Sequence, residues 1–141
     1  MAFKVLGVDH IGVAVNSIDE VGKFWNGILG IPHTMDDTVE EQKVTTGFFP
    51  TPNGAEIELL EATSDDSPIA KFIEKNGGRG GIQHVALRVD NIENAIADLL
   101  AKGVKMIDEK PRIGAGGSKI AFLHPKASHG VLVEICEHED R

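Results

Sequence analysis

The sequence has a single cysteine, no long apolar run and a shortage of basic residues. Because Cys136 is alone, an internal disulfide is excluded, and a reducing compartment, the cytoplasm, is expected. No apolar run approaches the roughly 20 residues that cross a bilayer. The opening stretch MAFKVLGVDH lacks the apolar centre of a secretion signal. We therefore expect a cytoplasmic protein without a membrane partner, in which Cys136 packs as a small hydrophobic residue.

The net charge of −8 argues against a nucleic-acid partner, which would require a basic surface. Basic residues nevertheless gather in one segment, between positions 102 and 126, where only two acidic residues accompany them. This basic segment has two interpretations: a solvated face, or a binding surface for an anionic ligand such as a phosphorylated cofactor tail. Its members are Lys102, Lys105, Lys110, Arg112, Lys119 and Lys126.

The chain contains an internal repeat. The block GVDHIGVAVNSIDEV, which starts at Gly7, resembles GIQHVALRVDNIENA, which starts at Gly81. A second block, GAEIELLE from Gly54, resembles GVLVEICE from Gly130 at nearly the same offset. The 141 residues therefore predict a single domain, 1–141, made of two copies of one unit, at about residues 5–63 and 80–138.

Each copy has the same local pattern. A short β-branched and apolar run predicts a strand, capping residues follow it, and apolar residues at helical spacing predict a helix. Two or three strands come next, ending at residues 56–60 or 131–135. The fold class is therefore α+β: two tandem β-α-β-β-β units that form a curled, cup-like mixed sheet.

A short helix and a linker are predicted between the copies. Ser67 precedes Pro68, which favours a capped helix over Pro68–Lys75. Residues 76–81 are rich in glycine. No strand precedes this stretch and no helix follows it, so it is interpreted as a linker and not as a phosphate-binding loop.

Each copy supplies one histidine and one glutamate at equivalent positions: His10 and Glu58 in the first, His84 and Glu134 in the second. Alternate residues of a strand share a face, so a curled sheet would gather all four on its concave side. Such a buried quartet is costly unless a cation compensates its charge. We predict that it binds one divalent metal ion; the mixed nitrogen and oxygen set suits Co²⁺, Ni²⁺, Zn²⁺, Mn²⁺ or Fe²⁺. The remaining histidines have no repeat partner and are interpreted as surface or loop residues: His33, His124, His129 and His138. Of these, His124 and His129 are candidate contacts at the rim of the site.

These units resemble the vicinal oxygen chelate (glyoxalase-like) superfamily, and most closely its methylmalonyl-CoA epimerase family. The resemblance lies in VDHIGVAV, HVALRVDNIENA, ELLEATSDDSPIAKFIEKNGG and, above all, IGAGGSKIAFLHPKASHGVLVE. It implies an isomerase that inverts C2 of methylmalonyl-CoA, a CoA thioester of propionate metabolism. It also implies a homodimer, Co²⁺ as the first choice of metal, and metal-ligand roles for the quartet.

The resemblance also implies separate roles for the metal and for the acid/base residues. The metal would chelate the substrate and stabilise the enolate formed when the C2 proton leaves, and inversion needs an acid/base group on each face. Glu134 is the first candidate base. Residues 43–49, where some family members are thought to carry the opposite glutamate, contain no carboxylate. Glu58 is therefore the second candidate, ahead of Glu40, Glu41 and Glu56.

The substrate's CoA arm has its own candidates. The glycine loop of Gly114, Gly116 and Gly117 would approach the thioester or the CoA arm through backbone N–H groups. Its alternative is a plain flexible turn. Within the basic segment, Arg112 and Lys119 flank this loop, and together with Lys126 they are the expected contacts of the CoA phosphates.

Two other functions stay open at this stage. A glyoxalase I-type lactoylglutathione lyase would use a similar quartet and the same proton-transfer logic. A non-catalytic, ligand-binding member of the superfamily would usually lack a complete metal set.

Overall fold

The computed structural model describes residues 2–139 and divides them into two compact units. One unit is His10–Gln83, here called the central unit; the other, the terminal unit, joins the residues up to Asp9 to those from His84 onward. The N-terminal segment belongs to the terminal unit partly through reciprocal bonds. The Lys4 amide donates to Asp90 Oδ1 (2.8 Å), and the Asp90 amide donates to the Lys4 carbonyl (3.1 Å).

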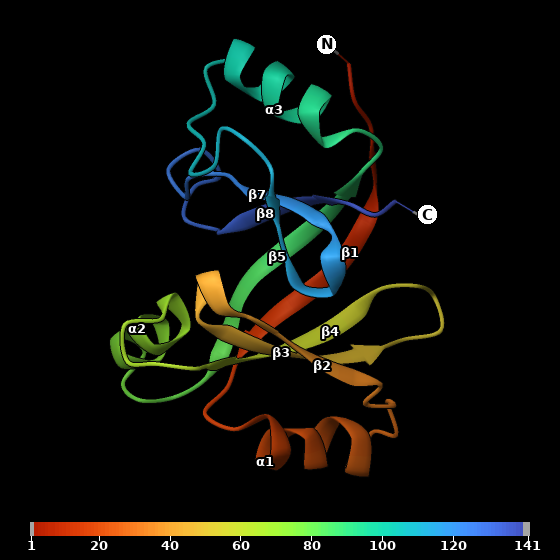
Figure 1. Cartoon of the computed structure of the whole chain (residues 1–141), viewed down its shortest axis with the longest axis vertical. Helices are drawn as coiled ribbons and strands as arrows, with labels where there is room; N and C mark the ends of the chain where they lie inside the picture. The colour runs from red at the N-terminus through yellow and green to blue at the C-terminus, as the bar shows by residue number, and fades with distance from the viewer. Residues whose placement is uncertain (1, 140–141) are drawn as a thin grey trace. The chain divides into compact units, whose positions relative to one another are not determined.

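The central unit has the predicted order of elements (Figure 1). Its strands pair in the order β2-β3-β4-β1, with β1 parallel to β4 and the other two pairs antiparallel. A short 3₁₀ turn, Glu40–Gln42, joins β2 to β3. The elements are β1 (Val5–Ala14, of which residues 10–14 lie in this unit), α1 (Ile18–Gly22), β2 (Met35–Val39), β3 (Val44–Pro50), β4 (Glu56–Ala62) and α2 (Pro68–Lys75).

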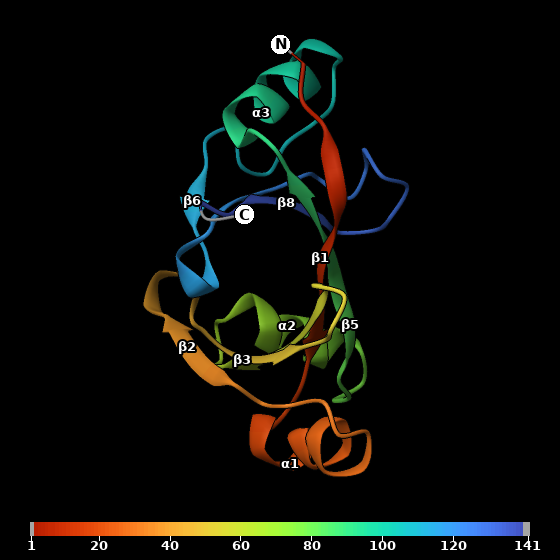
Figure 2. The same ribbon diagram turned by 90° about the vertical axis from the view of Figure 1, so that its right-hand side faces the viewer.

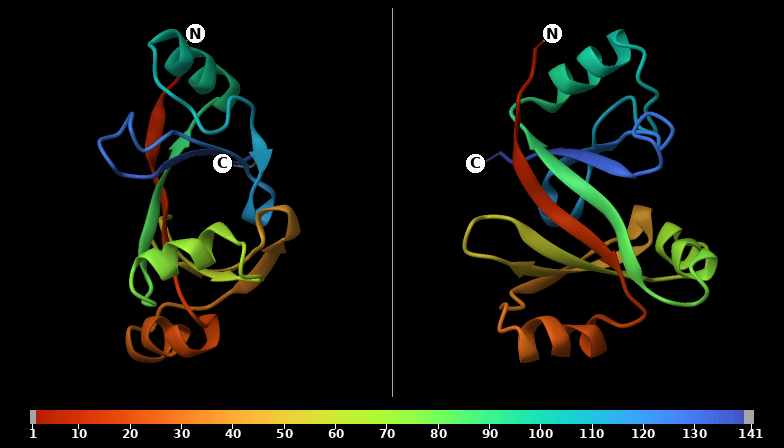
Figure 3. Two further views of the ribbon diagram at one scale, coloured as in Figure 1. Left: turned by 90° about the vertical axis from the view of Figure 1, so that its left-hand side faces the viewer. Right: turned by 180° about the vertical axis from the view of Figure 1, so that it is seen from behind.

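The terminal unit repeats this arrangement (Figure 3). Its strands pair in the order β5-β8-β7-β6, with β5 parallel to β8 and the others antiparallel. The prediction of an α+β fold with two β-α-β-β-β units of mixed sheet is confirmed. The elements are β5 (Gly81–Val89), α3 (Ile92–Ala101), β6 (Arg112–Ile113), β7 (Lys119–Phe122) and β8 (Val133–Glu137).

In the central unit, the two faces of the sheet have different partners. Leu59 packs in one apolar cluster with Ile18 of α1, which covers one side of the sheet (Figure 2). Leu60 points to the other face, where it packs with Ile69 and Ile73 of α2. Because alternate residues share a face, Glu58 lies on the Leu60 side, opposite α1.

The same alternation holds in the terminal unit. Ile135 of β8 packs with Ile92 and Ile96 of α3 in the principal apolar cluster. Glu134 and Cys136 therefore face the opposite side of the sheet, away from α3. In both units, the first helix (α1 or α3) packs on one face of the sheet, and the glutamate that the repeat shares, Glu58 or Glu134, lies on the other face.

A glutamate from the last strand caps the first helix of each unit. Glu61 Oε1 accepts the amide of Ile18 at 2.7 Å, and Glu137 Oε1 accepts the amide of Ile92 at 2.7 Å. Both amides belong to the first turn of a helix, where N–H groups lack intrahelical acceptors and the dipole favours negative charge. These two glutamates, which match in the repeat, therefore fasten each helix to its sheet.

Two local features refine the predictions. The helix expected after Ser17 is α-helical only over Ile18–Gly22 and continues as a π-helix over Lys23–Ile28. The helix Pro68–Lys75 is confirmed, with the Ser67 hydroxyl accepting the Ile69 amide at 3.1 Å.

The glycine-rich linker is packed against the sheet. A Cβ added at Gly80 would lie 2.3 Å from the Ala14 carbonyl oxygen, so only glycine allows this approach. The Asn16 side chain also donates to the Gly78 carbonyl at 3.1 Å. Within residues 2–139, no helix is both long and apolar enough to span a bilayer.

Candidate active site

His10 and Glu58 form a buried pair in the central unit. They lie on the neighbouring parallel strands β1 and β4, where Glu58 is in register with Gly12, two residues beyond His10. His10 Nδ1 lies 3.2 Å from Glu58 Oε2. Each residue is 6% exposed, so water screens the pair little.

His84 and Glu134 form the equivalent pair in the terminal unit. Glu134 of β8 is in register with Ala86, again two residues beyond the histidine, and His84 Nε2 lies 3.3 Å from Glu134 Oε1. The exposed fractions are 5% and 4%. The Phe122 ring packs against the imidazole of His84 in a T-shaped arrangement, with ring centroids 5.5 Å apart. The repeat has therefore placed the same two side chains in the same register twice.

These pairs have the chemistry of metal ligands. Placing a carboxylate beside an imidazole in a buried site is costly unless a positive charge or hydrogen bonds compensate it. Each pair supplies one imidazole nitrogen and one carboxylate oxygen, a donor set suited to a borderline divalent cation. The residues of both pairs thus fit the divalent metal that the sequence predicts.

The other candidate bases are less well placed. Glu56 lies on the same face of β4 as Glu58 and is half-buried, whereas Glu40 and Glu41 are exposed in the 3₁₀ turn after β2. Strand β3 carries no carboxylate; its fully buried polar residue is Thr46, 1% exposed. Among the glutamates named from the sequence, Glu58 combines burial with a histidine partner in the central unit.

Acidic neighbours already pair with half of the basic segment. Arg112 Nε lies 2.9 Å from Asp108, and Lys119 Nζ lies 3.2 Å from Glu93. Lys102 pairs with Asp98 at 2.8 Å, and its hydrogen bond lowers the pKa of that carboxyl. Arg112 and Lys119 are well exposed, so a phosphate group would have to compete with the two carboxylates for them.

The glycine loop is shaped largely by its own hydrogen bonds. The Gly114 amide donates to the Ser118 carbonyl (2.8 Å), and the Gly117 amide donates to the Gly114 carbonyl (3.1 Å). Gly116 and Gly117 have φ of 73° and 82°, which side chains rarely adopt. These two amides are therefore engaged within the loop, and the predicted role of the loop toward CoA stays a prediction.

The remaining histidines differ in their surroundings. His33 stacks on Phe49 with centroids 4.5 Å apart, His124 accepts the Lys126 amide in a turn, and His129 is exposed with φ of 60°. His138 is different, because its Nε2 lies 2.8 Å from Asp9 Oδ1 and its side chain is 22% exposed. Sequence reasoning missed this pair, because the residues are 129 positions apart. Asp9 lies in the repeated block, but the equivalent position of the second copy is Gln83, and His138 lies outside both blocks.

The chain also resembles known proteins. Residues 9–122 match the model of the Glyoxalase/Bleomycin resistance protein/Dioxygenase superfamily. The mitochondrial methylmalonyl-CoA epimerase of Dictyostelium discoideum is 40% identical over 130 residues, which cover 92% of this chain and 77% of that protein. The chain belongs to the methylmalonyl-CoA epimerase family of this superfamily. Membership confirms the predicted isomerase class and the vicinal oxygen chelate fold.

Two further relatives extend the comparison. The Bacillus subtilis (strain 168) protein YqjC is 42% identical and is matched over 92% of this chain and 91% of its own length. The structure of a Streptomyces coelicolor methylmalonyl-CoA epimerase variant in complex with 2-nitronate-propionyl-CoA superposes with a TM-score of 0.89. It is 34% identical, and the match covers 96% of this chain and 99% of that one.

Proposed function

We propose that this protein is a metal-dependent epimerase that inverts C2 of methylmalonyl-CoA through an enolate. The observation that carries the proposal is the pair of buried histidine–glutamate couples, one in each unit, in the same strand register. Family membership supplies the substrate class, because the epimerase relatives act on this CoA ester by name and the Streptomyces coelicolor relative binds a propionyl-CoA analogue.

The proposed metal ligands are His10 and Glu58 together with His84 and Glu134. Support comes from the burial of each pair and from the repeat, which gives both units the same nitrogen and oxygen donors. A divalent cation, with Co²⁺ as first choice, would supply positive charge for the oxygens of the acyl group. The two histidines must be neutral to act as ligands, so acidification should release the ion.

The glutamates are proposed to carry out the proton transfer. Removing the C2 proton leaves its electron pair delocalised onto the thioester oxygen as an enolate, and returning a proton to the opposite face completes the inversion. Glu134 is proposed as one base. Glu58 is the second choice, and its first role is as a ligand. In this scheme one carboxylate accepts the substrate proton and a group on the other face donates one, so protons balance over a turnover.

The CoA arm is proposed to contact Arg112, Lys119 and Lys126, together with the glycine loop. The Lys119–Glu93 salt bridge lies on the surface, where such pairs contribute at most about 1 kcal/mol, and the Arg112 side chain is itself exposed, so a multiply charged phosphate can compete for both cations. Replacing Arg112 and Lys119 with glutamine should raise KM and leave kcat nearly unchanged, since remote binding is largely uniform. An unchanged KM would return the segment to the solvated-face interpretation.

A pair of glutamine variants tests the catalytic assignment. Glutamine keeps an oxygen that can coordinate a metal but does not accept a proton at neutral pH. Glu134→Gln should keep part of its metal and lose about 10²–10⁴-fold in turnover, the usual contribution of an acid–base group. Glu58→Gln should keep both its metal and substantial activity. Metal content and epimerisation rate are measured on the same samples.

Isotope exchange separates the roles further. If Glu58→Gln exchanges the C2 hydrogen with solvent but no longer inverts the centre, Glu58 is the second base and the ligand-only assignment fails. If both variants are fully active, neither glutamate is a base and the proposed proton route is wrong.

We also propose a homodimer in the cytoplasm. The part of β1 in the terminal unit exposes apolar side chains that an interface would cover: Val5, Leu6 and Val8 are each about half exposed. Sedimentation of the wild type and of Leu6→Asp tests this assignment, because a dimer through β1 should dissociate in the variant. Cell fractionation tests the compartment.

A further inference from the structure

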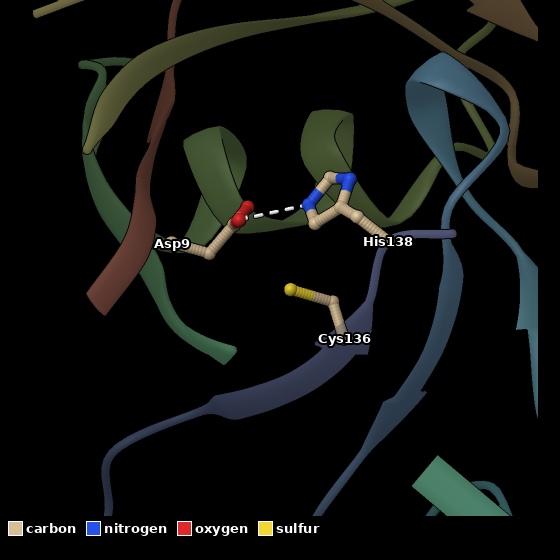
Figure 4. A group of neighbouring side chains, drawn as sticks. All are labelled: Asp9, Cys136 and His138. Carbon is tan, nitrogen blue, oxygen red and sulfur yellow. Dashed lines mark hydrogen bonds and ion pairs between the residues drawn. The ribbon is translucent and has the colours of Figure 1, made fainter. Parts of the chain in front are cut away.

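A second cluster of ligand-type side chains lies in the terminal unit. Asp9 of β1, Cys136 of β8 and His138, just after β8, converge on one point (Figure 4). One carboxylate oxygen, the thiol sulfur and one imidazole nitrogen all lie within 4.8 Å of one another. We propose that this triad binds a thiophilic divalent cation of the Zn²⁺ class through the Cys136 thiolate, a ligand type that the histidine–glutamate quartet does not contain.

The dimensions suit such an ion. Zinc bonds of roughly 2.0–2.3 Å to nitrogen, oxygen and sulfur place the donors of a tetrahedral site about 3.3–3.8 Å apart. The triad already lies inside a 4.8 Å envelope, so small side-chain rotations suffice. The Asp9–His138 contact of 2.8 Å would open by about half an ångström, because the ion replaces the hydrogen between the two atoms.

Charge balance favours the same ion. Cys136 is fully buried and Asp9 is 4% exposed, so a buried site must come close to neutrality. A thiolate and a carboxylate together carry two negative charges, which one divalent cation neutralises, and the imidazole binds as a neutral ligand. On binding, the S–H bond breaks, the S–metal bond forms and the thiol proton goes to solvent. The ring of His138 then carries its proton on Nδ1.

The cluster also provides a route of entry and an open position. The His138 side chain is 22% exposed, so an ion can reach the site from solvent on that side. Three protein ligands leave the fourth tetrahedral position to water. The thiolate distinguishes this site from the quartet, which contains only nitrogen and oxygen donors, and makes it selective for softer cations.

Cadmium is the sharpest probe, because a cadmium–thiolate bond gives an ultraviolet charge-transfer band that nitrogen and oxygen ligands do not. Cys136 is the sole cysteine, so any band reports this site. Titrating the reduced, metal-free protein with Cd²⁺ should give a band that saturates at one thiolate per chain. The band should vanish in Cys136→Ala, and His138→Gln should bind at least tenfold more weakly. The quartet variant His84→Ala should keep the band.

Each outcome decides the proposal. Absence of the band at saturating Cd²⁺ would overturn it. An unchanged Cd²⁺ affinity in His138→Gln would also overturn it, because the thiol would then bind the ion without the histidine. Asp9→Asn gives an independent reading if Cys136→Ala folds poorly, and its affinity should also fall. Because the readout is the thiolate band and not turnover, failure of the epimerase proposal would leave this result intact.

Discussion

Removing the Glu137 carboxylate should destabilise the terminal unit measurably. Glu137→Ala leaves the Ile92 amide without its 2.7 Å acceptor, and Ile92 is fully buried, so water does not replace the lost bond. An unsatisfied buried donor costs about 1–3 kcal/mol. The lost interaction with the helix dipole adds about 0.3–1 kcal/mol. At this chain length, 1 kcal/mol corresponds to roughly 3–4 °C in Tm.

Thermal unfolding followed by circular dichroism should therefore show a Tm lowered by several degrees, by roughly 4 °C at the least. Glu137→Gln is the matched control, because it keeps an acceptor oxygen and loses only the charge; its Tm should fall by about a third as much or less. Glu61→Ala should behave like Glu137→Ala, since Glu61 caps the Ile18 amide in the same way. If both alanine variants unfold at the wild-type temperature, the glutamates do not fasten the helices.

Three further outcomes are expected. His84→Ala should lower metal content and activity together, by more than the roughly 10–100-fold typical of groups that only support a ligand. If the variant keeps its full metal content, His84 is not a metal ligand. Gly80→Ala should destabilise by about 1–3 kcal/mol, because its Cβ would meet the Ala14 carbonyl, whereas Gly27→Ala, with nothing within 4 Å, should not. A hydrogen bond from Lys43 lowers the pKa of Asp66 from 3.8 to about 2. This pair therefore stabilises the fold above pH 3.8, and the stabilisation is lost as pH falls toward 2. In Lys43→Met, an NMR titration should show the pKa of Asp66 returning toward 3.8.

The fold was predictable because the sequence repeats. Strand, cap and helix signals occur at equivalent positions in both copies, so a pattern that is weak in one copy is strengthened by its recurrence in the other. The positions of His10 and Glu58 could be inferred as a pair for the same reason, since the repeat places His84 and Glu134 equivalently. The strand register could not be predicted from the sequence. Each glutamate lies opposite the residue two positions beyond its histidine, and this alignment is known only from the strand pairing.

Other features depend on contacts without a sequence pattern. Glu61 and Glu137 match in the repeat, but their capping role follows from the geometry between the last strand and the first helix of each unit. The Asp9–His138 pair joins opposite ends of the chain and has no repeat counterpart. Cys136 was expected to pack as a small apolar residue; it is fully buried, and its neighbours include two metal-ligand side chains.

Strand β3 contains no carboxylate, so the second base of the proposed reaction must come from another strand. The face opposite α1 offers Glu58 and, half-buried beside it, Glu56. Thr46 of β3 is buried but does not act as a base at neutral pH. A Glu56→Gln variant that inverts C2 at the wild-type rate would leave Glu58 as the carboxylate to test on that face.

Metal-dependent epimerisation can be measured by following C2 of methylmalonyl-CoA in deuterated water with the wild-type enzyme, before and after removal of its metal. One stereoisomer should be converted into the mixture of both, with deuterium gained at C2. Chelation of the metal should abolish this conversion, and Co²⁺ should restore it. The same samples should not act on methylglyoxal with glutathione. Turnover of the methylglyoxal–glutathione adduct, with no deuterium entering methylmalonyl-CoA, would exclude the epimerase and assign the quartet to a lyase of the glyoxalase I type.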